Sequence, residues 1–440
     1  MGVWQKSKAS AEIARKNDSL LLELKNILPD LDFGKDVGSS PYSIMAYEID
    51  ENFGTKNSLK SFRERLKKSG LKLILDFVPN HMAIDHEWVE TNAEYFINGS
   101  YEDLKKNPNA YFQAKNNKII AFGKDPYFPA WPDVAQLNYS NPETRKAMAE
   151  TVNGIAKMCD GMRCDMAMLI LNKIQKQIWG DKTKYLEPAN EFWNELIPLI
   201  KKEDPGFIFI AEAYWGLEDE LISYGFDFVY DIDFYHALIE NNIDRIKTIL
   251  SGGQKYSKNR LRFVENHDEP RALASFGRER ALPATIILAL TNGGHLFYQG
   301  QMEGFSKRLS VYLLRKASED VNEDIYSFYE NYFKALVEIK KLGIPWQYFE
   351  PEQDNANDIT NKNILAFSCG KYVAVVNYAH TEAKVKLKLD LSWVTLKYIV
   401  FSDKLSLVKF EKKPEDVVPD GLHLMLSPYD FHLFKIEEQN

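Results

Sequence analysis

Short apolar runs alternate with amphipathic stretches over the first three quarters of the chain. Runs such as LKLILDFV (71–78) and FIFIAE (207–212) are almost continuously apolar, which is typical of strands buried on both faces of a parallel sheet. Between such runs, apolar side chains recur at helical spacing, for example Leu59, Phe62 and Leu66. The pattern predicts helices between six strands, at 71–78, 160–165, 207–212, 227–232, 261–266 and 295–300. We therefore expect an α/β protein with a parallel sheet, and we favour a (β/α) barrel over an open sheet.

Two regions depart from this alternation. Residues 82–140 are polar and aromatic, contain Pro126, Pro129 and Pro132, and have no clear period. So long a connection inside a domain is usually functional. After a helix at about 322–342, short alternating strands separated by turn residues predict an antiparallel β domain. We expect a catalytic barrel over 1–81 and 141–345, an inserted excursion over 82–140 and a β-sandwich-like domain over 346–440.

Composition narrows the class of protein. The 440 residues are 45% hydrophobic and 27% charged, which is ordinary for a globular protein. The net charge of −8 argues against a basic nucleic-acid-binding protein. The sequence contains no apolar run of about 18 residues, so no membrane span is predicted. The three cysteines form neither a disulfide framework nor a zinc-binding spacing. The first residues lack the apolar segment of a signal peptide, so a cytoplasmic protein is expected.

Polar side chains gather where the predicted strands end. In a barrel enzyme this edge of the sheet carries the active site. Converging carboxylates supply the acid and the nucleophile of retaining glycoside hydrolysis, whereas Asp and His together can also ligate a metal ion. Spacing alone leaves both interpretations open. The residues concerned are Asp76, Asn80, His81, Arg163, Asp165, Glu212, Asn266, His267 and Asp268.

Four of these strand ends resemble the signature segments of the alpha-amylase family, glycoside hydrolase family 13. The similarity also includes SPYS (40–43) before FGT (53–55), and AQLN (135–138), so it spans about 1–345. The region after 345 resembles the family's C-terminal domain. This resemblance implies a (β/α)8 TIM-type barrel. The four segments, which occur in the family's order, are LDFVPNH (75–81), GMRCD (161–165), AEAYW (211–215) and VENHDEP (264–270).

The resemblance also implies catalytic roles. Asp165 corresponds to the nucleophile that forms a covalent glycosyl-enzyme, and Arg163 to the cation that keeps it ionised. Glu212 corresponds to the general acid and base, and its pKa is expected to be raised so that it begins protonated. Asp268 corresponds to the third acid, which binds sugar hydroxyls and favours the distorted sugar.

Substrate contacts are implied in the same way. His81 and His267 resemble the two histidines that hydrogen-bond the sugar, and Tyr42 resembles the tyrosine that stacks on it. For Asp76 we expect a structural role as a partner of Arg163.

The resemblance is less informative about calcium and about aromatic sugar platforms. Asn80 aligns with a calcium ligand of many relatives, but Leu169 stands where a histidine often donates its carbonyl oxygen. No acidic partners are recognised in 82–140, so no cofactor is expected, and calcium bound at Asn80 is kept as the alternative. Trp131 and Trp215 are left open between a sugar platform and core packing.

The beginning of the chain departs from the family. GVWQ (2–5) resembles the end of the family's second strand, so the first strand, the first helix and most of the second strand are missing from the sequence. Such a gap exposes strand edges, and we expect self-association and reduced stability. A helix over 8–28 can cover part of the gap with Leu20, Leu21, Leu22 and Leu24.

The sequence therefore predicts a retaining α-glycosidase or transglycosylase that acts on α-glucosidic bonds of oligo- or polysaccharides. Its expected partner is an α-glucan or oligosaccharide, without nucleic acid or membrane. The alternative is a catalytically impaired sugar-binding or interaction protein built on a truncated amylase-type barrel.

Overall fold

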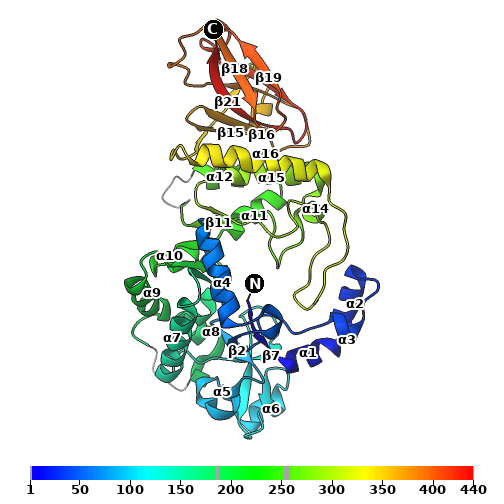
Figure 1. Ribbon diagram of the computed structural model, residues 1–440, viewed down its shortest axis with the longest axis vertical. Coiled ribbons are helices and arrows are strands. Elements are labelled where there is room, and N and C mark those ends of the chain that lie inside the picture. Colours follow the sequence, from blue (N-terminus) through cyan, green and yellow to red (C-terminus); the bar gives the residue numbers. More distant parts are fainter. Residues whose placement is uncertain (1, 184–187, 252–257, 440) are drawn as a thin grey trace. The chain divides into compact units, whose positions relative to one another are not determined.

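The computed structural model describes residues 2–183, 188–251 and 258–439 (Figure 1). Two compact units make up the chain. The first consists of Met1–Tyr230 with Leu309–Ala317, and the second of Asp231–Arg308 with Ser318–Asn440.

A parallel sheet organises the first unit. Its strands are β3 (Ile74–Phe77), β8 (Gly161–Cys164), β9 (Ile208–Ala211) and β10 (Phe228–Tyr230), in that order. Gly161 is required where β8 passes β9, because a Cβ there would lie 2.5 Å from the carbonyl oxygen of Ile208. The intervening helices are α7 (Pro142–Ala156), α8 (Asn172–Trp179), α9 (Phe192–Glu203) and α10 (Glu218–Ser223), and α7 and α9 lie side by side (Figure 1).

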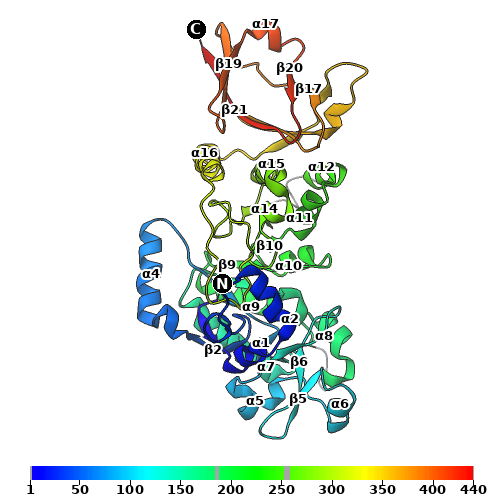
Figure 2. The same ribbon diagram turned by 90° about the vertical axis from the view of Figure 1, so that its right-hand side faces the viewer.

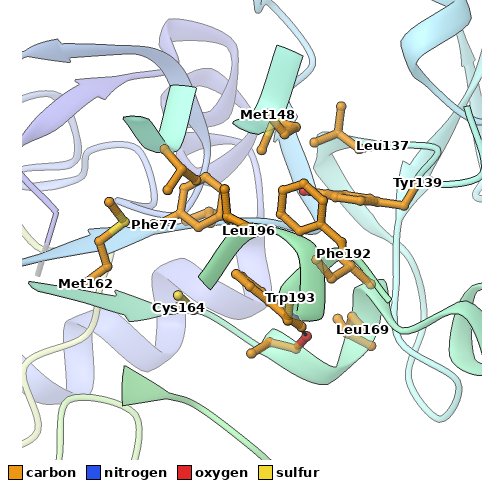
Figure 3. Packing of buried hydrophobic residues seen from close by; sticks show 14 of the residues in the cluster. Phe77, Leu137, Tyr139, Met148, Met162, Cys164, Leu169, Phe192, Trp193 and Leu196 are labelled. Carbon is orange, nitrogen blue, oxygen red and sulfur yellow. Dashed lines mark hydrogen bonds between the residues drawn. The ribbon is translucent and has the colours of Figure 1, made fainter. Parts of the chain in front are cut away.

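The core of this unit combines aromatic and aliphatic side chains (Figure 3). Phe77, Cys164 and Trp193 are buried in one cluster with side chains from α7 and α9. Side chains alternate along β8, so Cys164 faces this core while Arg163 and Asp165 face the other way. The indole N–H of Trp193 donates to the carbonyl oxygen of Ala167 at 2.8 Å, which ties α9 to the loop after β8.

The excursion contains a small antiparallel sheet. Its order is β4 (His81–Ala83), β7 (Trp131–Gln136), β6 (Ile119–Gly123) and β5 (Tyr111–Gln113), with helices α5 (Glu87–Thr91) and α6 (Tyr101–Lys106). Each strand has three to six residues. Such strands are too short for the alternation of apolar and polar residues to show in the sequence.

The N-terminal strand lies outside the parallel sheet. β1 (Trp4–Lys6) pairs antiparallel with β2 (Ile44–Ile49), whereas the sequence likened residues 2–5 to the end of a barrel strand. This long-range pairing cannot be read from local periodicity. The indole N–H of Trp4 also donates to the carbonyl oxygen of Asp76 at 2.7 Å, so β1 is held against β3 by a side chain.

The helical stretch expected over 8–28 forms two helices, α1 (Lys8–Arg15) and α2 (Asp18–Ile27), each with a side-chain cap. Leu21 and Leu24 are buried, whereas Leu22 is 65% exposed. These helices pack on Leu313 and neighbouring residues of the segment 309–317. Helix α3 (Phe33–Asp36) follows them. Helix α4 (Lys56–Lys68) lies at the margin of the unit with no buried residue (Figure 2).

The second unit begins with helices and two short strands. β11 (Arg260–Arg262) and β12 (Gly294–His295) pair in parallel. The helices are α11 (Ile232–Ile239), α12 (Ile243–Ser251), α14 (Ala272–Ser275), α15 (Gly277–Ala289) and α16 (Glu323–Lys340). None of the described helices of the chain combines the length and the apolar character needed to cross a membrane.

The chain ends in an antiparallel β domain, as predicted. Residues from both of its sheets share one apolar core, and Figure 2 shows β17 and β20 opposite β19 and β21. One sheet runs β13 (Gln347–Phe349), β15 (Ile364–Cys369), β16 (Tyr372–Asn377), β21 (Phe431–Gln439), β18 (Tyr398–Asp403) and β19 (Lys409–Lys412). The other contains β14 (Glu352–Gln353), β17 (Ala383–Leu387) and β20 (Leu422–Leu426), and the short helix α17 (Pro414–Val417) precedes β20.

Candidate active site

The ends of β8 and β9 bring two predicted catalytic acids onto one cation. Nη1 of Arg163 donates to Oδ1 of Asp165 at 2.9 Å, and Nη2 donates to Oε2 of Glu212 at 2.8 Å. Oδ2 of Asp76, on the neighbouring strand β3, lies 3.9 Å from Nη1. All four side chains are buried. A planar guanidinium can serve two carboxylates in this way, and these short charged hydrogen bonds compensate for the loss of water.

The parallel register explains the convergence. Asp76 on β3 lies opposite Arg163 on β8, and Arg163 lies opposite Ile210 on β9. The N–H of Asp165 donates to the carbonyl oxygen of Phe77, which continues the sheet one residue beyond β8. Residues 49 positions apart in the sequence therefore share one hydrogen-bonded group.

Arg163 remains a cation in this site. Burial disfavours its charged form, yet the charge of Glu212 and the neighbouring Tyr42, Tyr230 and Asp76 hold the pKa of the guanidinium above its usual range. The guanidinium carbon lies 5.4 Å from the ring centroid of Tyr42 and 5.8 Å from that of Tyr230. Tyr42, which the resemblance assigned to the sugar, thus also contributes a cation–π contact.

His81 is buried on β4. Burial lowers the pKa of its imidazole to about 4, although a hydrogen bond with the backbone of Tyr42 opposes this shift. The ring is therefore neutral near pH 7, and its Nδ1 lies 3.3 Å from Nδ2 of Asn80. Its ring centroid lies 5.4 Å from that of Trp131, so this half-buried tryptophan packs against the histidine.

The side chain of Asn80 is hydrogen-bonded to that of Gln136. Its Nδ2 donates to Oε1 of Gln136 at 3.2 Å, and Nε2 of Gln136 donates to Oδ1 of Asn80 at 2.9 Å. Within the described ranges, no group of three or more His, Cys, Asp or Glu side chains is placed to hold a metal ion.

The remaining predicted residues lie in the second unit, after β11. Oδ1 of Asn266 accepts hydrogen bonds from the N–H groups of Asp268 and Glu269, at 2.9 and 2.8 Å, and this turn fixes the loop. Nε2 of His267 lies 2.9 Å from Oδ2 of Asp268, whose side chain is 35% exposed. That Asp268 and His267 act together with Asp165 and Glu212 stays a prediction.

Tyr214 is a site residue that the sequence did not single out. Its hydroxyl donates to Oε1 of Glu212 at 2.9 Å. The N–H of Met166 donates to Oε2 of the same carboxyl at 2.8 Å, and Met166 is in the left-handed region at φ 39°. No pattern in the sequence marks this contact, because Glu212 and Tyr214 lie beyond the end of β9, where the alternation of a strand no longer applies.

An aromatic group stands near the same loop. The side chains of Tyr127 and Phe128 are 66% and 68% exposed, and Trp215, three residues after Glu212, is 37% exposed. The ring centroids of Tyr127 and Trp215 are 5.1 Å apart. Oδ1 of the buried Asp125 accepts from the N–H groups of Tyr127 and Phe128, so the turn that presents these rings is fixed. Trp215, which the sequence left open, is therefore not a core residue, and Tyr127 and Phe128 are further candidates that the sequence did not single out.

Comparison with known proteins decides the family. The profile described as "Alpha amylase, catalytic domain" matches residues 39–335, which include the four signature segments. The chain belongs to the alpha-amylase family. Its fold is accordingly of the family's (β/α)8 barrel type, of which β3, β8, β9 and β10 are successive parallel strands. An alpha-amylase from Lactobacillus plantarum superposes with a TM-score of 0.63 at 19% identity, over 99% of this chain and 97% of that one.

Two relatives illustrate the range of the family. The chain is 26% identical over 266 residues to "Alpha-amylase MalA" of Haloarcula japonica, over 59% of this chain and 35% of that protein. It is 27% identical over 337 residues to "Glucan 1,6-alpha-glucosidase" of Streptococcus dysgalactiae subsp. equisimilis, over 64% and 61% respectively. The chain therefore spans less than two thirds of the length of either relative.

Proposed function

We propose that this protein is a retaining enzyme that cleaves or transfers α-glucosidic bonds of oligo- or polysaccharides. The observation that carries the proposal is the pair of buried acids, Asp165 and Glu212, that share the guanidinium of Arg163 at adjacent strand ends. Retaining glycoside hydrolysis uses two carboxyl groups in one site, one as the nucleophile and one as the acid and base.

In the first step, Asp165 attacks the anomeric carbon while Glu212 gives its proton to the glycosidic oxygen. The bond between the carbon and that oxygen breaks, and the leaving sugar departs as an alcohol. In the second step, Glu212 takes a proton from water or from a sugar hydroxyl, and the new oxygen displaces Asp165. Arg163 keeps its charge throughout, which favours the ionised form of Asp165 as a nucleophile.

For the substrate, we propose an α-glucan or an α-linked oligosaccharide. The printed names of the relatives include an alpha-amylase and a glucan 1,6-alpha-glucosidase. Exposed aromatic rings suit the flat apolar faces of sugars, and Trp215 and Tyr127 offer such rings beside the loop that carries Glu212. We assign His81, His267, Tyr42 and Asp268 to the reacting sugar on the strength of the family resemblance.

The stereochemistry of the product tests this proposal. Proton NMR of the reaction with α-1,4- and α-1,6-linked oligosaccharides should show the α-anomer as the first product, before mutarotation. Appearance of the β-anomer first would contradict a retaining mechanism. Saturable sugar binding without turnover, measured by calorimetry on the same protein, would instead support the non-catalytic alternative.

A further inference from the structure

The two oxygens of Glu212 have different kinds of partner. Oε2 accepts hydrogen bonds from Nη2 of Arg163 and from the N–H of Met166, both at 2.8 Å. Oε1 accepts a hydrogen bond from the hydroxyl of Tyr214 at 2.9 Å. This asymmetry matters because a general acid must carry its proton on one particular oxygen.

Nitrogen donors exclude the proton from Oε2. A guanidinium and a backbone N–H can donate but cannot accept, so a proton on Oε2 would point at other hydrogens. A hydroxyl differs, because it can donate to a carboxylate and accept from a carboxylic acid. The partner of Oε1 is therefore compatible with both protonation states that Glu212 passes through in the proposed reaction.

The surrounding structure holds this arrangement in place. The N–H of Ala167 donates to the backbone carbonyl oxygen of Glu212 at 3.0 Å, and the carbonyl oxygen of Ala167 accepts from the indole of the buried Trp193. The ring of Tyr214 is half-buried against the core of the unit. The carboxyl of Glu212 is thus held at Oε2 by Arg163 and the N–H of Met166, and at Oε1 by Tyr214.

We propose that Tyr214 is a positioning residue for the acid and base Glu212, and this inference rests on the proposed function. Its hydroxyl defines Oε1 as the oxygen that carries the proton. When Oε1 releases the proton to the glycosidic oxygen, the hydroxyl of Tyr214 donates to the carboxylate that remains. When Oε1 recovers a proton from the incoming water or sugar hydroxyl, the hydroxyl of Tyr214 again becomes an acceptor.

The test compares Tyr214→Phe with a matched control, Tyr224→Phe. The hydroxyl of Tyr224 donates to Oε1 of Glu220 at 3.0 Å, so the control removes a tyrosine–glutamate hydrogen bond elsewhere in the same unit. For each variant, kcat/KM is measured with an α-linked oligosaccharide and with an activated aryl α-glucoside, because this constant reports on the glycosylation step. Thermal unfolding establishes that both variants fold.

We expect Tyr214→Phe to lower kcat/KM about 10-fold for the oligosaccharide and less than about 3-fold for the aryl glucoside, whose leaving group needs little protonation. Tyr224→Phe should leave both values nearly unchanged. In a Glu212→Gln background, Tyr214→Phe should have no further effect, because its role acts through Glu212.

Equal losses for the two substrates, or an additional loss in the Glu212→Gln background, would overturn the positioning role. Turnover that Tyr214→Phe does not change would overturn it while leaving the proposed function intact. Absence of turnover in the unaltered protein would overturn both.

Discussion

Two buried arginines hold carboxylates in different ways. At the ends of β8 and β9, Arg163 donates to both Asp165 and Glu212. In the second unit, Nη1 of Arg271 donates to Oε1 of Glu265 at 2.7 Å, and Glu265 also follows a strand, β11. Both arrangements are almost inaccessible to solvent, so burial of charge does not distinguish a reaction centre from a structural ion pair.

The partners of the carboxyl oxygens make the difference. In Glu265, Oε1 accepts from Arg271 and Oε2 accepts from the N–H of Ala272 at 2.6 Å, so nitrogen donors occupy both oxygens. Burial raises the pKa of Glu265, although the N–H of Ala272 and the charge of Arg271 oppose that shift. Glu212 instead has the hydroxyl of Tyr214 on Oε1. Two features distinguish Glu212 from the structural Glu265: a second acid shares its cation, and its hydroxyl partner can accept a hydrogen bond as well as donate one.

The largest difference in kcat/KM is expected between variants of the acids Asp165 and Glu265. Asp165→Asn removes the nucleophile with little change in volume, and kcat/KM on an α-linked oligosaccharide should fall by roughly 10⁴-fold while the fold persists. Glu265→Gln should lower the thermal midpoint, because Arg271 loses a charged partner, but should cost less than about 10-fold in kcat/KM. A folded Asp165→Asn protein with near-normal rates would contradict the comparison.

The acid is expected to show a dependence on the leaving group. Glu212→Gln should reduce the glycosylation rate by about 10³-fold for an oligosaccharide and by far less for an activated aryl glucoside, which needs little protonation. Rapid-quench measurement of the first step with both substrates checks this. Equal losses would mean that Glu212 does not protonate the leaving oxygen.

The next largest difference is expected between variants of the two arginines, Arg163 and Arg271. Arg163→Lys replaces a planar fork with a single ammonium group, which cannot hold two carboxylates in one geometry, so we expect about a 10²-fold lower kcat/KM. Arg271→Lys should change the thermal midpoint more than the rate. Steady-state kinetics and calorimetry on the two variants give the answer, and a larger rate loss in Arg271→Lys would reverse our assignment.

The smallest effect is expected on stability, from His81, which is buried as a neutral imidazole. The pKa of His81 is lowered to about 4 by burial, so the unfolded chain binds a proton between about pH 6.5 and 4 that the folded chain does not. The stability from the neutral ring is present above pH 6.5 and is lost as the pH falls through that window. His81→Gln should reduce the slope of unfolding free energy against pH by up to roughly 1.4 kcal/mol per pH unit there.

Urea denaturation at a series of pH values measures this slope. The control is His423→Gln, because hydrogen bonds to Asp354 and Asp420 raise the pKa of His423. Its contribution is present below its unfolded pKa and is lost as the pH rises, so its removal should change the slope in the opposite sense. Identical slopes for the unaltered protein and His81→Gln would show that His81 is not buried as a neutral ring.

The sequence predicted those features of the fold that follow from local patterns and short motifs. The sequence predicted the strand that contains Asp76 and the strands that end just before Asp165 and Glu212, and their parallel pairing follows from the alternation with helices. Pairings between distant segments could not be predicted, such as Trp4 with Ile49 in β1 and β2. Periodicity describes one segment at a time and says nothing about its partner.

The site, like the fold, was predicted only in part. Family motifs identified the acids, but the contact between Tyr214 and Glu212 depends on how a side chain turns at the end of β9. The exposed rings of Tyr127 and Phe128 were missed because their short loop, KDPYFPA, resembles other polar and aromatic parts of the excursion. The break between α1 and α2 depends on Asn17, whose side chain caps α2.

The most direct test of the central claim is to trap the covalent intermediate. The protein is incubated with 5-fluoro-α-D-glucosyl fluoride, whose good leaving group allows the first step while its ring fluorine slows the second, and then digested and sequenced by mass spectrometry. Our account predicts a fluoroglucosyl adduct on the peptide that contains GMRCD, localised to Asp165, and no adduct in Asp165→Asn. A labelled peptide elsewhere, or rapid fluoride release without any adduct and with inverted product, would contradict it.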